Sequence, residues 1–274
     1  MVVLFGLVTA FSWAFANVFT QQASRTKTKP AVIMFWVLIV TAAVVLPVAL
    51  VVDRLEGPWT PAGLGWPILA GLLATVGFFL LLRALTKGSL SVVAPIIALE
   101  GGVATLLSIA LGERPSAVQY VLLGVAVVGA FLVAVEPGRR TAAGAPEAVL
   151  AAFAYAGVLI ALGQSNLPDL TTVGVTRTVS VLAILPAFLL VRELPKRTNV
   201  YPILWCGLLD AVGFAFFAFA ASIGPLSVAS VTATQWGTAA ALIGIIGMRE
   251  RLYTNQYIGI AVTLFAVTGL GLLS

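Results

Sequence analysis

Apolar stretches of about 20 residues recur along the whole chain, and their recurrence strongly limits how it can fold. A transmembrane helix needs roughly 20 consecutive, mainly apolar residues to cross a bilayer. Ten stretches of this kind are present: residues 2–20, 32–52, 66–85, 89–110, 117–135, 146–165, 173–191, 202–221, 225–247 and 254–273. They lack the alternating pattern of a membrane β-barrel. The sequence therefore predicts an all-α integral membrane protein with ten transmembrane helices.

The composition excludes several other classes of protein. Charged residues make up 9% of the chain, whereas a soluble domain has about 25%. The loops between the spans leave no room for a soluble domain or a nucleotide site. Cys206 is the single cysteine and falls inside a predicted helix, which excludes a disulfide framework. Because the chain has no histidine, no metal motif and no nucleophile elbow, we expect neither an enzyme nor a cofactor.

The basic residues indicate an orientation in the membrane. Twelve of the 15 lysines and arginines fall in the first, third, fifth, seventh and ninth loops, and three fall on the other side. Basic loops are enriched on the cytoplasmic side. This pattern predicts a multi-pass protein of the cytoplasmic (inner) membrane with both termini outside. It also explains the basic charge without nucleic acid, and the lipid bilayer is the expected partner.

An internal repeat relates the two halves of the chain. Shifting the sequence by 136 positions aligns 69–108 with 205–244, and 14 of the 40 pairs are identical. "GSLSVV" at 88–93 matches "GPLSVA" at 224–229, and "ERPSAVQY" at 113–120 matches "ERLYTNQY" at 250–257. We assign 1–138 to the first five-helix repeat and 139–274 to the second.

The odd number of helices in each repeat has a consequence for topology. Two consecutive five-helix repeats enter the membrane in opposite directions. Such inverted repeats are typical of secondary transporters, whose substrate sites lie near the bilayer midplane between the halves. The pattern therefore predicts transport by alternating access around a central cavity.

These features together resemble a known family. The five-helix repeat, the Gly-x-Leu-Ser-Val motif, and a glutamate followed six residues later by glutamine (Glu113 and Gln119, Glu250 and Gln256) are similar to the EamA domain of the drug/metabolite transporter superfamily. The ten-helix build resembles YddG-type bacterial amino-acid exporters. The resemblance implies export of amino acids, either aromatic and neutral or of broad range. The sequence leaves the oligomeric state open, and a monomer is compatible with it.

Glu100 is the first candidate residue of the substrate site. It lies inside an apolar run, "PIIALEGGVATLL" at 95–107, where a charge costs about 2.5–3.5 kcal/mol on insertion scales. We expect it to line the cavity and to bind a substrate ammonium or change protonation during the cycle. The alternative is a protonated glutamate bonded to a neighbouring backbone or hydroxyl group. Gly101, one residue later, begins a stripe of small residues that we expect to pack against another helix.

Asp210 is the second candidate acid. It shares a helical face with Gly213, Phe214 and Phe217, which suits a cavity wall. Its repeat mate is Ala74, so the repeat itself does not require an acid there. The alternative is an aspartate shallow enough in its helix to reach interfacial water.

Repeat-related aromatic residues complete the predicted chamber. Three pairs of mates would form its walls: Trp13 with Tyr155, Phe78 with Phe214, and Glu100 with Trp236. Each aromatic taken alone is better explained by core packing, and the case for a chamber comes from the set. Two polar neighbours, Asn17 and Gln235, are further candidates.

Other residues receive structural roles with a functional alternative. Pro47, Pro95 and Pro186 interrupt helical hydrogen bonding, so they are candidate hinges or fixed kinks. Arg177 is expected to begin the seventh span, in interfacial capping chemistry, with an outer gate as the alternative.

Two other functions compete with amino-acid export. One is a cation (Mg²⁺-like) channel or transporter, which two isolated acids would serve poorly because hard cations take six or more oxygen ligands. The other is an exporter of another small amine or drug-like metabolite.

Overall fold

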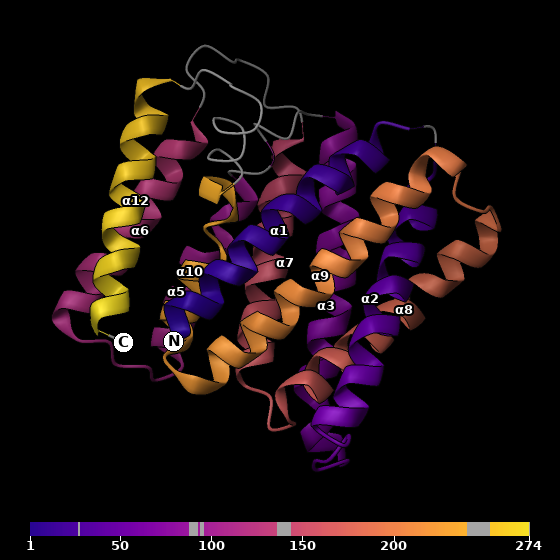
Figure 1. Cartoon of the computed structure of the whole chain (residues 1–274), viewed down its shortest axis with the longest axis horizontal. Coiled ribbons are helices and arrows are strands. Elements are labelled where there is room, and N and C mark those ends of the chain that lie inside the picture. The colour runs from indigo at the N-terminus through magenta and orange to yellow at the C-terminus, as the bar shows by residue number, and fades with distance from the viewer. Residues whose placement is uncertain (27, 88–92, 94–95, 136–143, 240–252, 274) are drawn as a thin grey trace.

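The computed structural model describes residues 1–26, 28–87, 93, 96–135, 144–239 and 253–273. Within these ranges all the regular elements are α-helices (Figure 1). The elements of the first repeat are α1 (Val2–Ser24), α2 (Pro30–Val52), α3 (Pro61–Lys87), α5 (Glu100–Ala110) and α6 (Ala117–Ala134). Those of the second are α7 (Ala145–Gly163), α8 (Asp169–Val191), α9 (Arg197–Ile223), α10 (Leu226–Ala233) and α12 (Thr254–Leu273). The predicted all-α architecture is confirmed.

The helix lengths fit a bilayer. Among the described residues, six helices are long and apolar enough to cross a membrane: α1, α2, α3, α7, α8 and α9. Eight predicted spans match observed helices to within five residues at each end. The other two, 89–110 and 225–247, lie partly outside the described residues, as does the predicted boundary between repeats at 138.

The described parts of those two spans contain a matched irregularity. The amide of Leu99 donates to the carbonyl of Ile96, and the amide of Gln235 donates to that of Thr232, each at 3.3 Å. These are three-residue steps of the 3₁₀ type rather than the four-residue step of an α-helix. Because 99 and 235 are repeat mates, both spans tighten at the same place.

Helix ends are capped across the two repeats. The Glu113 carboxylate, at the end of α5, accepts hydrogen bonds from the amide of Ser227 (3.1 Å) and from its hydroxyl (2.8 Å) at the start of α10. The Asp53 carboxylate accepts from the amide of Thr171 in the first turn of α8 (2.8 Å). An unsatisfied backbone group is costly near a bilayer, so these caps secure both helices. Glu113, which belongs to the motif shared by both repeats, therefore caps a helix of the other repeat.

The strongest helix pairings join one repeat to the other. Helix α1 packs against α9, and α3 packs against α7, which is the same pairing after the repeats are exchanged. Helix α2 pairs with α8, α5 with α10 and α6 with α12, each with its own repeat mate. In Figure 1 the α6–α12 pair lies at one end of the molecule and the α2–α8 pair toward the other. The core is therefore an interface between repeats.

Two glycines show how closely the repeats match. A Cβ atom on Gly71 would lie 2.6 Å from the carbonyl oxygen of Thr176, and one on Gly207 would lie 2.8 Å from that of Val37. The two contacts exchange when the repeats are exchanged. Small residues allow helix backbones to approach in this way. The same explanation holds for Gly101, whose Cβ would collide with Thr234 Oγ1 at 1.8 Å, so its packing role is confirmed.

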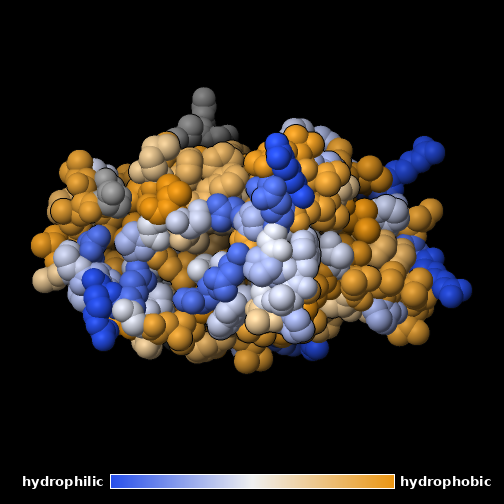
Figure 2. Space-filling view, turned by 90° about the horizontal axis from the view of Figure 1, so that it is seen from below, coloured by the Kyte–Doolittle hydropathy of each residue, from blue (hydrophilic) through white to orange (hydrophobic). Residues whose placement is uncertain are grey.

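The N-terminus and the C-terminus lie on the same side of the helical bundle. Figure 1 shows that α1 begins and α12 ends at the same edge of the molecule, as an even number of crossings requires. Figure 2, which looks at this edge, shows hydrophilic side chains across its middle, surrounded by mainly hydrophobic ones. This is the pattern of an end surface that meets water between lipid-facing sides.

Candidate functional site

A cavity lies between the two repeats. The empty space inside it, including its open part, is about 740 Å³. Six of its lining side chains come from α1, α2 and α3: Trp13, Asn17, Thr20, Leu38, Ala74 and Phe78. Seven others come from α5, α7, α8, α9 and the turn after α10: Glu100, Tyr155, Arg177, Cys206, Asp210, Phe214 and Trp236.

The aromatic walls are positioned by glycines. The Trp13 ring lies 5.1 Å from the Phe214 ring, centre to centre, and its indole nitrogen fills the place that a Cβ on Gly213 would need, at 2.4 Å. The Tyr155 ring lies in the same way against Gly77, at 3.1 Å. Since 13 and 155 are mates, as are 77 and 213, the same device holds both walls.

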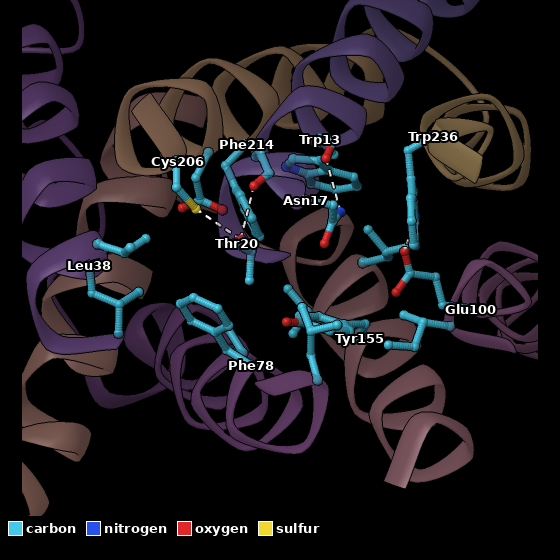
Figure 3. A pocket seen from close by; sticks show the side chains of 18 of the residues that line it. Trp13, Asn17, Thr20, Leu38, Phe78, Glu100, Tyr155, Cys206, Phe214 and Trp236 are labelled. Carbon is cyan, nitrogen blue, oxygen red and sulfur yellow. Dashed lines mark hydrogen bonds between the residues drawn. The ribbon is translucent and has the colours of Figure 1, made fainter. Parts of the chain in front are cut away.

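Glu100 and Trp236 meet at the point where the repeats cross. Trp236 Nε1 donates a hydrogen bond to Glu100 Oε1 at 3.3 Å (Figure 3). Both residues are buried, with Glu100 4% and Trp236 3% exposed. A residue touches its own repeat mate only near the axis that relates the repeats. The matched turns at 99 and 235 immediately precede these two side chains and aim them at each other.

Asp210 is part of an ion pair inside the cavity. Arg177 Nη2 lies 3.2 Å from Asp210 Oδ2 and 3.4 Å from Oδ1, and the guanidinium carbon lies 3.6 Å from the centre of the Phe214 ring. Thr41 Oγ1 donates to Asp210 Oδ2 at 3.0 Å. The Asp210 carboxylate is therefore held by side chains of α2 and α8 on the cavity wall.

Three further polar side chains of the wall make contacts within the protein. Asn17 Nδ2 donates to the carbonyl oxygen of Trp13 at 2.9 Å. Thr20 Oγ1 and Cys206 Sγ lie 3.1 Å apart (Figure 3). Asn17 keeps its amide oxygen on the cavity side of α1, while Thr20 and Cys206 join α1 to α9.

Eight of the nine predicted site residues line this one cavity. The exception is Gln235, which is buried in a local network: its Nε2 donates to the carbonyl of Val231 and its Oε1 accepts from Thr238, both at 3.1 Å. Pro47 and Pro186 lie within α2 and α8 on exposed surfaces, away from the cavity. Pro95 lies outside the described residues.

Arg177 is the functional residue that sequence reasoning missed. The apolar window placed it at the beginning of a span, but α8 begins at Asp169, so Arg177 lies two turns inside the helix and is 3% exposed. The repeat held the missing signal. "LPVAL" at 46–50 and "LPAFL" at 185–189 align with a shift of 139, which pairs Arg177 with Leu38 in the interior of α2.

The arrangement is suited to binding rather than to catalysis. In the described part of the chain, no three histidine, cysteine, aspartate or glutamate residues cluster to hold a metal ion. The cavity instead offers one guanidinium, two carboxylates and aromatic faces in a buried volume. Such a set can hold a small organic molecule with charged ends and an apolar body.

Comparison with known proteins agrees with this architecture. A solved structure described as "Crystal structure of protein" superposes with a TM-score of 0.79 at 16% identity, over 99% of this chain and 96% of that chain; at this identity the likeness shows the fold. None of the curated proteins matches the chain. The model of the EamA-like transporter family matches residues 1–135 and again 143–272. The chain therefore belongs to the EamA-like transporter family, as a membrane transporter built from two EamA domains.

Proposed function

We propose that this transporter exports amino acids, aromatic and neutral ones in particular, by alternating access around the central cavity. The observation that carries the proposal is Glu100, a buried carboxyl group in an aromatic-walled cavity at the crossing of the two repeats. The YddG-type resemblance seen in the sequence supports export of this substrate class.

Glu100 has the capacity to bind an ammonium group. Among the described residues, the hydrogen bond that engages its carboxyl group comes from the neutral indole of Trp236. A carboxylate has two oxygens that can accept about four hydrogen bonds, and its charge-assisted bonds are roughly twice as strong as neutral ones. An alkylammonium brings both the missing donors and the opposite charge, while Trp13, Phe78 and Tyr155 enclose the apolar part of the substrate.

The repeat supplies a means of alternating access. Two related halves can rock around a fixed site near the midplane, and the helices that cross there tighten at Leu99 and Gln235. We propose that these turns are the pivots, with Pro47 and Pro186 as bends in the outer helices α2 and α8. Pro95 remains a sequence-level prediction.

The geometry supports an organic substrate over a divalent cation. A hard cation takes six to eight oxygen ligands, but the Asp210 carboxylate already faces the Arg177 guanidinium at 3.2 Å. A fixed positive charge in the cavity repels a second one.

Proteoliposome uptake tests the proposal. Purified protein is reconstituted and supplied with labelled phenylalanine, leucine, alanine and simple amines at two pH values, with Glu100→Gln measured beside the parent. We expect uptake above empty liposomes and a loss of about tenfold in Glu100→Gln, the loss expected for about 1.4 kcal/mol. Flux equal to that of empty liposomes for every compound would overturn the proposal.

We further propose a cytoplasmic-membrane location with both termini outside, from the basic loops. Single cysteines introduced at the exposed positions Arg25 and Glu56 test it with a membrane-impermeant thiol reagent, because the native Cys206 is only 4% exposed. Position 56 should label from outside and position 25 should not; the reverse pattern would invert the topology.

A further inference from the structure

We propose that Arg177 binds the carboxylate of the transported substrate, with Phe214 as its platform and Asp210 as its orienting partner. The inference rests on the proposed function and narrows it: the substrate is an amino acid and not a simple amine.

The position of Arg177 is unusual for an arginine. It is 3% exposed and lies two turns inside α8. A charged side chain at such depth is costly, and as a rule it faces a partner or a water-filled cavity and marks a substrate pathway. Arg177 faces both a partner and the cavity.

The guanidinium has hydrogen-bonding capacity left over. It carries five N–H donors, and Asp210 is engaged by Nη2. Arg177 Nε is buried and has no hydrogen-bond partner among the described residues. A planar guanidinium can bind a carboxylate through two parallel N–H bonds. Because Arg177 lines the cavity, its remaining donors are the candidates for binding a second carboxylate.

Asp210 and Phe214 fix the guanidinium for that purpose. The Phe214 ring covers one face at 3.6 Å, as an aromatic ring does in a cation–π contact. Asp210 is itself held by Thr41 Oγ1 at 3.0 Å. The plane of the guanidinium is thus set before a ligand arrives, which lowers the entropy lost on binding.

The repeat indicates that this ion pair is an addition to the scaffold. Leu38 and Ala74 are the mates of Arg177 and Asp210, and both also line the cavity. The fold therefore accommodates an apolar pair at the equivalent place. Because the scaffold does not require the charges, recognition of a ligand is their explanation.

The two binding groups are arranged for a zwitterion. In Figure 3 Glu100 and Trp236 lie at one end of the cavity, whereas Phe214 lies toward the end that holds Cys206 and Leu38. The cavity thus has a separate group for each charge of a zwitterion, Glu100 for an ammonium and the Arg177 guanidinium beside Phe214 for a carboxylate, with aromatic rings beside the apolar side chain.

Three matched compounds test the assignment: phenylalanine, phenylalanine amide and phenethylamine. All three have the ring and the amine, but only phenylalanine has the carboxylate. A leucine series, with leucinamide and isoamylamine, serves beside it. Each is assayed for uptake and for competition in proteoliposomes. We expect the parent to prefer each acid over its amide by at least about tenfold, since a site built around a hydrogen-bonding group rejects analogues that lack it.

Variants locate the preference. Arg177→Gln should reduce the acid-to-amide preference to about one, Arg177→Lys should keep part of it because the charge remains without the planar fork, and the exposed-arginine control Arg25→Gln should keep all of it. If Arg177→Gln does not fold, the double variant Arg177→Leu with Asp210→Ala serves instead, because it copies the pair Leu38 and Ala74.

The outcomes separate this inference from the proposed function. Equal uptake of acid and amide by the parent would refute the role of Arg177 and leave amine transport by Glu100 standing. A full acid preference in the folded Arg177→Gln or double variant would refute it as well. Absence of flux for all six compounds would overturn both proposals.

Discussion

Leu38 and Ala74 in the first repeat stand where Arg177 and Asp210 stand in the second, and all four side chains line the same cavity. The contacts that shape the cavity do not differ in this way. Gly71 and Gly207 lie against equivalent carbonyls, and the aromatic mates lie against equivalent glycines. The comparison teaches that duplication set the shape of the cavity, while its charges arose where the repeats diverged.

Glu100 and Trp236, the repeat mates where the two repeats cross, also differ in charge. Glu100 and Trp236 occupy one position of the repeat and touch each other, so an acid in one half has a neutral donor from the other as its neighbour. A strictly symmetric protein would place two acids or two indoles there. Divergence at this position gives the cavity a distinct end, and a zwitterion can then bind in one orientation.

The largest expected effect tests the matched part of the comparison. Gly71→Ala and Gly207→Ala each place a Cβ atom 2.6–2.8 Å from a backbone carbonyl of the facing helix, which cannot move without shifting that helix. We expect each variant to lose about 3 kcal/mol of stability or to fail to fold, since overpacking costs about 1–3 kcal/mol and sometimes more. Thermal unfolding in detergent, followed by tryptophan fluorescence, measures the loss.

The matched control is Gly65→Ala, in the same helix as Gly71. A Cβ there meets no atom within 4 Å, and the change should be neutral or slightly stabilising because alanine favours helix. If one of the two buried glycines tolerated alanine and the other did not, the packing of the repeats would not be equivalent.

The next effect tests the diverged part. Asp210→Ala leaves the Arg177 guanidinium buried without its counter-charge. Breaking a buried pair costs about 3–5 kcal/mol, and we expect about 2–3 because the aspartate side chain is 20% exposed. Adding Arg177→Leu should recover most of the loss, because the double variant carries the pair that the first repeat already holds.

A double-mutant cycle measures this recovery in the same unfolding assay. The single variant Arg177→Leu completes the cycle. Losses that simply add in the double variant would mean that the two side chains do not interact energetically, and the contrast between the repeats would then lack an energetic basis.

A third prediction compares the two mates at the crossing through transport. Trp236→Phe removes the indole donor but keeps an aromatic wall, and the Glu100 carboxylate stays available to substrate. We expect uptake to fall about twofold to fivefold, less than the tenfold expected for Glu100→Gln, in keeping with a neutral hydrogen bond worth about 0.5–1.5 kcal/mol. Initial rates in proteoliposomes measure both. A larger loss from Trp236→Phe would make the indole, not the acid, the principal contact.

Much of this arrangement was predictable from sequence because the repeat fixes helix rotation. Once 69–108 is aligned with 205–244, mates must face a common axis, and that placed Glu100 opposite Trp236 and Phe78 with Phe214. Length and hydrophobicity gave the spans, since a bilayer sets the length of an apolar helix. The EamA resemblance of the two repeats was confirmed by the family comparison.

What the sequence did not reveal depends on contacts between distant segments. Arg177 was expected at the interfacial start of its span because a hydropathy window treats a charge as the end of a span, but α8 begins at Asp169 and Asp53 caps its first turn. The ion pair between Arg177 and Asp210 could not be inferred because the two residues are 33 positions apart in the sequence. Leu38 and Ala74 are indistinguishable by composition from lipid-facing residues, and Gln235 was wrongly expected in the cavity because its partners Val231 and Thr238 were unknown.

The smallest expected effect concerns Ser180 and Thr41, which occupy equivalent positions in the two repeats. It distinguishes the shared packing of the repeats from the charged cavity wall. Ser180 Oγ donates to the carbonyl of Gly71 at 2.9 Å, and Thr41 Oγ1 donates to that of Gly207 at 3.1 Å, so the two hydroxyls play one scaffold role. Thr41 Oγ1 also lies 3.0 Å from Asp210 Oδ2, so its single hydrogen is shared between the carbonyl and the carboxylate. Hydrogen bonds between membrane helices are worth about 0.6 kcal/mol on average.

Ser180→Ala should therefore cost about 0.6 kcal/mol in the unfolding assay, whereas Thr41→Val should cost about 1–2 kcal/mol because a bond to a charged group is also lost. In the Asp210→Ala background that excess should disappear, and the two hydroxyls should become equivalent. An excess that persisted without Asp210 would place its cause in the packing of valine, and the difference between the mates would then belong to the scaffold instead of the charged cavity wall.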